Sequence, residues 1–517
     1  MNSNDVILRL RAFHAGHPLS RGTTKRTFVA DNEDVLIVSF VKMGGESRPW
    51  GIAFGKAGTV PKVVVVPEAR NRDLVAEMAV KFAPVLLRHL RHPSQGNPIL
   101  DNWEYLKPIR QLWLPNESHL DMLHHLAYAY ARTSYGGAHR EMLNALGRAC
   151  GWLFREAQRP GQMSVAVATQ VLREAFTFPT ENIRQSHLGY LLAWLETRGN
   201  YEKRLAAATD AEQRSTSTSL DPELERRDLE PQVEQWGEAN KSGSKGQQSS
   251  AAKAIEVVLR RELEHRWQLT ERALQFFRND RRRDNSGLAQ LVDESLREQW
   301  FQYTRLERRI DDEEDGPAFF PPVETDNHPA AAASRYLVYQ ASAELVESLL
   351  VHDDKELLVE AIANGDAFQG EIIHVFDDRI GRTTRPVWKI VDTAERQLRL
   401  RLGSRVAAVG FKERTGVIRA IDKRDDGSFV IEVEITGRKT DRNPGPGIHA
   451  YSPIEPRRLL RHETAFVSAP ADAISRRKSQ RIWQNDGPGA WLTHCKPGAR
   501  HAVTLEGEPD DVATSEE

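Results

Sequence analysis

The sequence predicts a multi-domain α+β protein with a small N-terminal α/β unit, a central helical bundle, a helical hairpin and a small C-terminal β-barrel. Three observations lead to this prediction. The 517 residues suffice for roughly three to four domains of about 150 residues each. Apolar residues recur at helical spacing through the middle of the chain and at alternate positions in its last third. Polar stretches rich in Ser, Gly or Pro separate these regions.

Residues 1–110 predict a small α+β domain. Residues 35–41 are rich in β-branched side chains, and Gly44 and Gly45 follow them, which is typical of a strand that ends in a turn. Residues 50–54 and 62–66 are further strand candidates. A helix is expected over 72–89, with Leu74, Met78, Phe82 and Leu86 on one face.

Residues 111–204 predict a bundle of four amphipathic helices with short loops. The third and fourth helices, joined by residues 177–180, also have the spacing of a helix-turn-helix. Ordinary bundle packing is the favoured interpretation, because the second of these helices continues into the apolar run 191–195 and has Arg184 as its only early basic residue.

The regions between residues 205 and 366 are predicted from their composition and from the spacing of their apolar residues. Residues 205–250 predict a flexible polar segment with a short helix, and 251–312 a long, coiled-coil-like helical hairpin with Trp267 and Trp300 in its apolar stripes. The arginine-rich turn 278–285 is either an ordinary charged turn or a phosphate contact. An acidic, proline-containing linker (313–330) and a helical region (331–366) follow.

Residues 367–462 predict a basic β-barrel, and residues 463–517 a flexible tail. Within the barrel, the strand run Gly416-Val417-Ile418-Arg419-Ala420-Ile421 and the hairpin into Phe429-Val430-Ile431-Glu432-Val433 resemble an SH3-like barrel of the KOW or Tudor kind. The resemblance covers residues 403–435, a small part of the chain. It implies a fold and no particular activity.

Charge is distributed unevenly along the chain, although the net charge is only −2. Residues 311–378 contain 17 acidic and 2 basic residues, a balance of −15, whereas residues 382–500 contain 24 basic and 13 acidic residues, a balance of +11. Such asymmetry is typical of a nucleic-acid surface. The alternative is that both segments are solvated surface or face each other.

Motifs for catalysis and cofactors are missing from the sequence. It contains no phosphate-binding G-x-x-x-x-G-K-[ST] loop, no G-x-S-x-G elbow and no Cys-x-x-Cys pair. We therefore expect no cofactor, and the sequence favours a protein that is not an enzyme. Glu371, Asp377 and Lys389 leave a metal-dependent nuclease as a third alternative. The two cysteines and the lack of long apolar runs predict a cytoplasmic protein without membrane segments.

The function predicted from these features is that of a non-catalytic nucleic-acid-binding accessory protein. Its expected partners are DNA or RNA and a separate helicase or nuclease, for example in bacterial DNA processing or phage defence. The main alternative is a protein–protein scaffold.

Basic side chains neutralise phosphates and aromatic rings stack on bases. The predicted nucleic-acid-binding residues are therefore Arg382, Arg385, Trp388, Lys389, Arg399, Arg401, Lys412, Arg414 and Arg419.

Overall fold

The protein is a mixed α+β chain that divides into two compact units, Met1–Val323 and Glu324–Glu517, as the computed structural model shows. The structure describes residues 3–22, 24–31, 34–43, 48–90, 110–135, 137–158, 162–282, 288–289, 292, 295–296, 350–380, 383–392, 397–408, 411–436 and 463–468. The prediction of a multi-domain α+β protein is confirmed. Each unit is described by itself below.

The first unit is built on a five-stranded mixed sheet with strand order β4-β3-β2-β5-β6. Strands β2 (Val35–Val41), β3 (Gly51–Lys56) and β4 (Lys62–Val65) form an antiparallel meander. On the other side of β2, strands β5 (Gln111–Leu114) and β6 (Val165–Val167) continue the sheet in parallel. Every residue of β2 is buried, because both faces of this central strand are covered.

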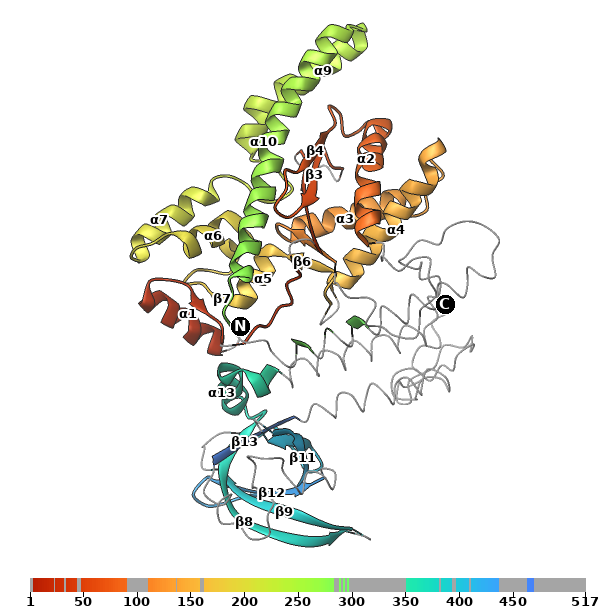
Figure 1. Cartoon of the computed structure of the whole chain (residues 1–517). Helices are drawn as coiled ribbons and strands as arrows, with labels where there is room; N and C mark the ends of the chain where they lie inside the picture. The colour runs from red at the N-terminus through yellow and green to blue at the C-terminus, as the bar shows by residue number, and fades with distance from the viewer. Residues whose placement is uncertain are drawn as a thin grey trace, which may run out of the picture. The chain divides into compact units, whose positions relative to one another are not determined.

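Helices cover the two faces of the sheet (Figure 1). Alternate residues of a strand point to opposite faces. Phe40 therefore meets the Phe82 ring of α2 (Arg72–Leu90), whereas the neighbouring Ser39 donates a hydrogen bond to the carbonyl of Leu263 in α10 (Lys245–Arg278). Helices α3 (Glu117–Tyr130) and α4 (Arg140–Ala157) lie on the α2 side and pack against each other. The unit thus has three layers around one core.

The region predicted as a helical bundle forms part of this sheet. Residues 111–114 and 165–167 are strands, so the expected third helix begins only with α5 (Ala168–Ala175). These strands were missed because they are three or four residues long and buried on both faces, which removes the alternation that marks a strand. Strand β7 (Phe176–Thr177) and the short helix η4 (Ile183–Ser186) precede α6 (Leu188–Glu196). Helix α6 is almost entirely buried, which contradicts a groove-reading role.

The prediction of a flexible segment over 205–250 is wrong. These residues form the end of α7 (Tyr201–Glu212), a buried Ser/Thr stretch, α8 (Pro222–Leu224), the π-helix η5 (Glu225–Leu229), α9 (Glu230–Ser242) and the start of α10. Between α9 and α10, Gly243 adopts a φ of 72°, a conformation that glycine allows at no steric cost. Two helices joined by such a tight turn lie against each other as an antiparallel pair.

Helix α10 is the first arm of the predicted hairpin, but its apolar stripe packs on the sheet. Ile255, Leu259, Leu263 and Trp267 are buried in the same core as the strands. Of the second arm, only residues 288–289, 292 and 295–296 are described, and they are helical. Trp300, the linker 313–330 and most of the helical region 331–366 lie outside the described residues. The described end of that region contains α13 (Lys355–Ala363).

Three further elements complete the first unit. Helix α1 (Ser3–Ala15) leads to β1 (Leu19–Ser20), which pairs antiparallel with β7. The 3-10 helix η3 (Gly137–His139) leads into α4.

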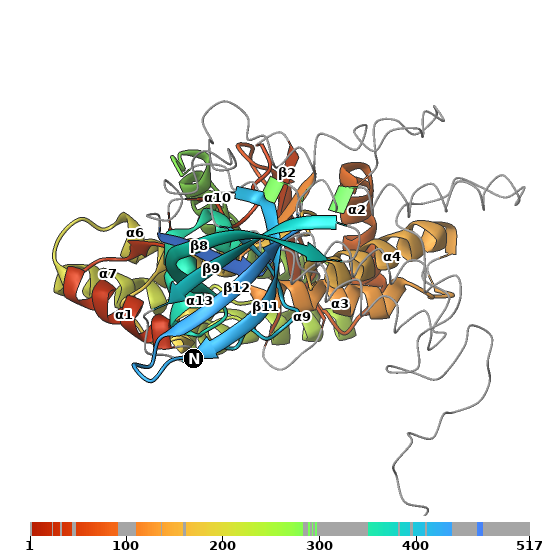
Figure 2. The same cartoon turned by 90° about the horizontal axis from the view of Figure 1, so that it is seen from below.

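The second unit contains a six-stranded antiparallel barrel with the order β10-β11-β12-β9-β8-β13. Figure 2 shows strands β8, β9, β12 and β11 of this barrel. Its strands are β8 (Phe368–Ile380), β9 (Thr383–Asp392), β10 (Arg405–Ala408), β11 (Phe411–Lys423), β12 (Phe429–Ile435) and β13 (Glu463–Ser468). Strand β13 pairs with both β8 and β10. It belongs to the stretch predicted as a flexible tail, so that prediction is wrong for residues 463–468. The remaining tail lies outside the described residues.

Candidate functional site: the barrel surface and a buried polar network

The outer face of the barrel carries three predicted nucleic-acid-binding residues in ion pairs. Lys389 on β9 is directly opposite Glu432 on β12, with Nζ and Oε1 3.2 Å apart. Arg385 lies 2.8 Å from a carboxylate oxygen of Glu434. The register explains both pairs: Lys389 is directly opposite Glu432, whereas Arg385 is two residues from Val387, the residue opposite Glu434, and reaches Glu434 diagonally.

Arg419 joins this set through a bulge in β11. Between Ile418 and Ala420 the register with β12 shifts, which leaves Arg419 unpaired in the ladder. Its guanidinium lies 2.9 Å from Glu434 and 2.7 Å from Asp378. Three basic side chains on this face thus meet three carboxylates. A phosphate would have to compete with partners that are already in place.

Trp388 does not present a ring to a nucleic-acid base. Its side chain is 2% exposed and packs in the barrel core with Ile390, Ile431 and Val433. Successive strand residues point to opposite faces, so the outward position of Lys389 forces Trp388 inward. The prediction that Trp388 stacks on bases is wrong, because a stacking ring must be accessible.

Residues 397–404 form a loop along which side chains alternate between the barrel core and solvent. Leu398 and Leu400 pack against the barrel core, whereas Arg399 and Arg401 are exposed. Arg399 reaches Asp366 at 3.5 Å, and both side chains remain more than half exposed. Among the described residues, no acidic side chain pairs with Arg401. Leu402 departs from this alternation and is 65% exposed, because the chain turns at Gly403, where φ is 81°.

The remaining predicted residues are only partly described. Arg382 lies outside the described residues. Lys412 and Arg414 belong to β11, and their side chains lie outside the description. The exposed Arg405, at the start of β10, lies close in sequence to Arg399 and Arg401. Among the described residues of the barrel, the predicted cations that are exposed to solvent, Arg399 and Arg401, therefore lie in the loop 397–405.

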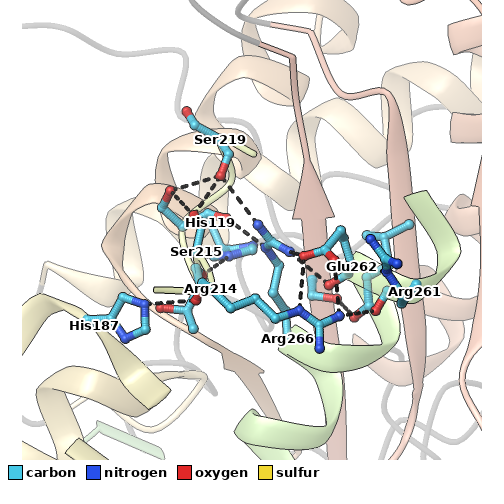
Figure 3. A network of polar contacts seen from close by, with 12 residues as sticks. His119, His187, Arg214, Ser215, Ser219, Arg261, Glu262 and Arg266 are labelled. Carbon is cyan, nitrogen blue, oxygen red and sulfur yellow. Dashed lines mark hydrogen bonds and ion pairs between the residues drawn. The ribbon is translucent and has the colours of Figure 1, made fainter. Parts of the chain in front are cut away.

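A second concentration of polar groups lies inside the first unit (Figure 3). Its centre is the segment 214–219, Arg-Ser-Thr-Ser-Thr-Ser, here called the strap. The backbone NH of Lys42, just after β2, donates to the carbonyl of Thr218 at 2.7 Å. Asn116, just after β5, donates from Nδ2 to the carbonyl of Thr216 at 3.0 Å. Ligands of open α/β sheets commonly bind outside the carboxyl ends of parallel strands, and here the strap occupies that position.

Arg266 of α10 holds the strap from the other side. Its guanidinium is fully buried and donates to the carbonyls of Ser217 at 2.7 Å and Ser219 at 3.3 Å. Glu262, one helical turn earlier, lies 3.2 Å from Arg266 and 3.0 Å from Arg214. A buried charge is tolerated only when it is paired and hydrogen-bonded. Both conditions are met here.

The electrostatics of this network are those of a structural site. Burial would raise the pKa of Glu262, but hydrogen bonds and charges from Arg214 and Arg266 outweigh it and lower the pKa. Burial lowers the pKa of Arg266 to about 10, which keeps it charged at neutral pH. Glu262 and Arg266 bind each other and the strap, so neither group is placed to exchange protons with a substrate.

Two histidines connect the strap to neighbouring backbone, His119 to strand β2 and His187 to the N-terminus of α6. His119 Nδ1 accepts from the backbone NH of Phe40 at 3.0 Å, so Nε2 must carry the proton that it donates to the Thr216 carbonyl at 3.1 Å. His187 Nδ1 accepts from the NH of Tyr190, and Nε2 donates to the Arg214 carbonyl at 3.0 Å. Both rings are therefore neutral and fully engaged.

This network was not predicted from the sequence, because a Ser/Thr run is usually a solvated linker. A signal was nevertheless present. Glu262 and Arg266 are four residues apart and lie among Leu259, Leu263 and Trp267 on the apolar stripe of one helix. A charged pair inside such a stripe indicates a buried polar partner on the neighbouring segment.

The described residues show neither a metal site nor a membrane span. No group of three or more His, Cys, Asp or Glu side chains within them is arranged to hold a metal ion. No helix in the described part is long and apolar enough to cross a bilayer. No protein-family model matches the chain, and no curated protein or solved structure proved detectably similar to it.

Proposed function

We propose that this protein is a non-catalytic nucleic-acid-binding accessory protein that contacts phosphates through the loop 397–405 of its C-terminal barrel. The observation that carries the proposal is the exposure of Arg399, Arg401 and Arg405 within seven residues, next to a core that holds the loop in place through Leu398 and Leu400. Exposed arginines so closely spaced can follow a phosphate backbone.

The charge balance of +11 over residues 382–500 supports the same proposal. An SH3-like character of the barrel is part of it, since β10, β11 and β12 span the segment 403–435 that carries the resemblance. In this proposal a separate helicase or nuclease supplies the motor or cleavage activity.

Salt-dependent binding of the full chain tests the proposal. Single- and double-stranded DNA and RNA are titrated with the protein at several salt concentrations. Each phosphate contact contributes about 0.7 to 0.9 to the slope of log K against log salt. Replacing Arg399 and Arg401 with Ala should therefore flatten the slope by about 1.4 to 1.8 units. The double variant should keep the stability of the parent, because both side chains are exposed.

Arg385→Ala with Lys389→Ala is the matched control. These side chains already have carboxylate partners, so removing them should leave the salt slope unchanged. If both double variants flatten the salt slope equally, the binding surface does not lie in the loop. If neither DNA nor RNA binds at low salt, the proposal is rejected.

A protein–protein scaffold is the second candidate function. The mutual neutralisation of Arg385, Lys389 and Arg419 by carboxylates favours it, since such a face does not attract phosphates. Under this alternative, a protein co-purifying with the full chain would remain bound in high salt, whereas a nucleic-acid contact would be weakened.

A further inference from the structure

Helix α1 carries a stripe of large apolar side chains that faces solvent. Val6, Ile7, Leu10 and Phe13 are 38%, 52%, 53% and 52% exposed. Their spacing of three, four and seven residues places them along one side of the helix. Ala12 is fully buried, so α1 packs on the unit with its other side. The apolar stripe of this helix is therefore available to a partner.

The surroundings of α1 extend the stripe into a patch. The Phe13 ring meets Tyr201 of α7 edge-on, with centroids 5.0 Å apart, and Arg9 donates a hydrogen bond to Asn182. Ile183, the next residue, is 78% exposed. Figures 1 and 2 both show α1 beside α7. We call Val6, Ile7, Leu10, Phe13 and Ile183 the α1 patch. Scattered exposed apolar residues are ordinary, but a cluster of them marks an interaction site.

The sequence of α1 and of the segment that follows it is mostly basic. Residues 5–26 contain five basic side chains and one acidic side chain, which gives 5 − 1 = +4. The five are Arg9, Arg11, Arg21, Lys25 and Arg26. A fitting partner is therefore acidic and carries its own large apolar side chains.

The same chain contains such a segment, which lies outside the described residues. Residues 311–323 read DDEEDGPAFFPPV, with five acidic and no basic residues, a balance of −5. Phe319 and Phe320 provide two adjacent aromatic rings, and Val323 a third apolar side chain. The segment thus matches the α1 patch both in charge and in apolar content.

The chain is long enough for the two to meet. Leu296 packs with Met163 and Phe28, so the chain leaves the described part close to the segment that follows α1. Asp311 is 15 residues further on, a distance that an extended chain covers over about 50 Å. Helix α1 itself is only about 20 Å long.

We propose that the α1 patch binds the acidic segment 311–323 of the same chain. Phe319 and Phe320 would lie against Leu10 and Phe13, and the acidic run would lie near Arg11. Burial of the exposed apolar stripe drives the contact, and charge sets its direction.

Disulfide trapping in the full chain tests this proposal. Leu10→Cys and Phe319→Cys are introduced together with Cys495→Ser, and the buried Cys150 is kept. Mild oxidation should close an internal disulfide, detected as a monomer that has lost two hydrogens in mass. The matched control pairs Phe319→Cys with Val60→Cys, because Val60 is 90% exposed but lies in the turn between β3 and β4. The control should cross-link more slowly.

Charge variants give a second readout. Adding Arg11→Glu to the Leu10→Cys/Phe319→Cys chain should slow cross-linking about two- to fivefold, the effect expected of an exposed charge pair. Lys253→Glu, an exposed lysine on α10, should leave the rate unchanged.

Three outcomes would overturn the proposal. One is equal cross-linking of Leu10→Cys and Val60→Cys. Another is a predominance of intermolecular disulfides, which would identify a second copy as the occupant. The third is binding of the parent chain to phosphatidylserine vesicles that Leu10→Glu abolishes while no internal disulfide forms. Because Leu10 is exposed, these substitutions should not disturb folding.

Discussion

Individual histidines connect the strap to the rest of the first unit through neutral rings. His119 is completely buried, and both of its nitrogens are hydrogen-bonded to backbone groups. Protonation would place an N–H against the Phe40 N–H, which cannot accept a hydrogen bond. Burial, together with the charge of Arg266, lowers the pKa of His119 to about 3 from its ordinary value of 6.5. The network is therefore stable only while this ring is neutral.

The first unit should lose stability as the pH falls from 6.5 towards 3. Over this range the unfolded chain protonates His119 and the folded chain does not, so the free energy of unfolding decreases by about 1.4 kcal/mol per pH unit. Above pH 6.5 neither state is protonated and the contribution is fully present. Urea unfolding at pH 7 and pH 5 should therefore differ by about 2 kcal/mol from His119 alone.

The variant His119→Gln should be less stable than the parent at pH 7 but should lose less between pH 7 and pH 5. His125→Gln is the control, since His125 is exposed on the same helix. Burial lowers the pKa values of His89 and His265 to about 4. Both residues therefore also reduce the free energy of unfolding between pH 7 and pH 5, and they do so equally in the parent and in both variants. An identical pH dependence in parent and His119→Gln would contradict this account of the ring.

At the scale of elements, α10 joins the sheet, the strap and the helices into one structure. Its apolar stripe covers one face of β2 and β3, while Glu262 and Arg266, on the same helix, hold the strap. Arg282, just beyond its end, pairs with Asp280 and reaches the carbonyl of Ala175. With its side chain only 12% exposed, Arg282 is not an open phosphate contact in the turn.

Trp267→Ala should destabilise the first unit strongly. The side chain is 2% exposed within the shared core, and truncation of a buried Trp costs about 3–5 kcal/mol. Val257→Ala is the control on the same helix, because Val257 is 64% exposed and should have little effect. Thermal unfolding measures both. A Trp267→Ala variant with an unchanged melting temperature would show that the stripe does not pack on the sheet.

At the scale of the whole molecule, the first unit has one hydrophobic core that draws on residues from Ala30 to Phe277. Residues 1–110, 111–204, 205–250 and the first part of 251–312, which the sequence predicts as separate regions, all contribute to it. Elements that share a core of this kind fold together.

A fragment of residues 1–204 should therefore not fold by itself, whereas a fragment of residues 1–323 should. Without α10, one face of β2 and β3 is left exposed to water, and the strap that satisfies Asn116 and His119 is missing. Circular dichroism and urea titration of both fragments give the measurement. A cooperative unfolding transition in the 1–204 fragment would contradict the single core.

The sequence by itself determined the local structure wherever a residue pattern is compatible with only one type of secondary structure. The β-branched run 35–41 became β2, the helical spacing over 72–89 became α2, and the burial of Trp267 follows from its place on an apolar stripe. The alternation of Leu398 and Leu400 with Arg399 and Arg401 also holds in the loop they form. These features depend on neighbours within a few residues.

Only the tertiary structure decided which partner each pattern meets. The apolar stripe of α10 fits a second helix as well as a sheet, and the Ser/Thr strap is as polar as a linker until Arg266 and Asn116 surround it. Likewise, the barrel arginines are equivalent in the sequence, but strand register pairs Arg385 and Arg419 with Glu434 and leaves Arg401 exposed. The reason is physical: burial and ion pairing are contacts between distant residues, and a local pattern does not contain them.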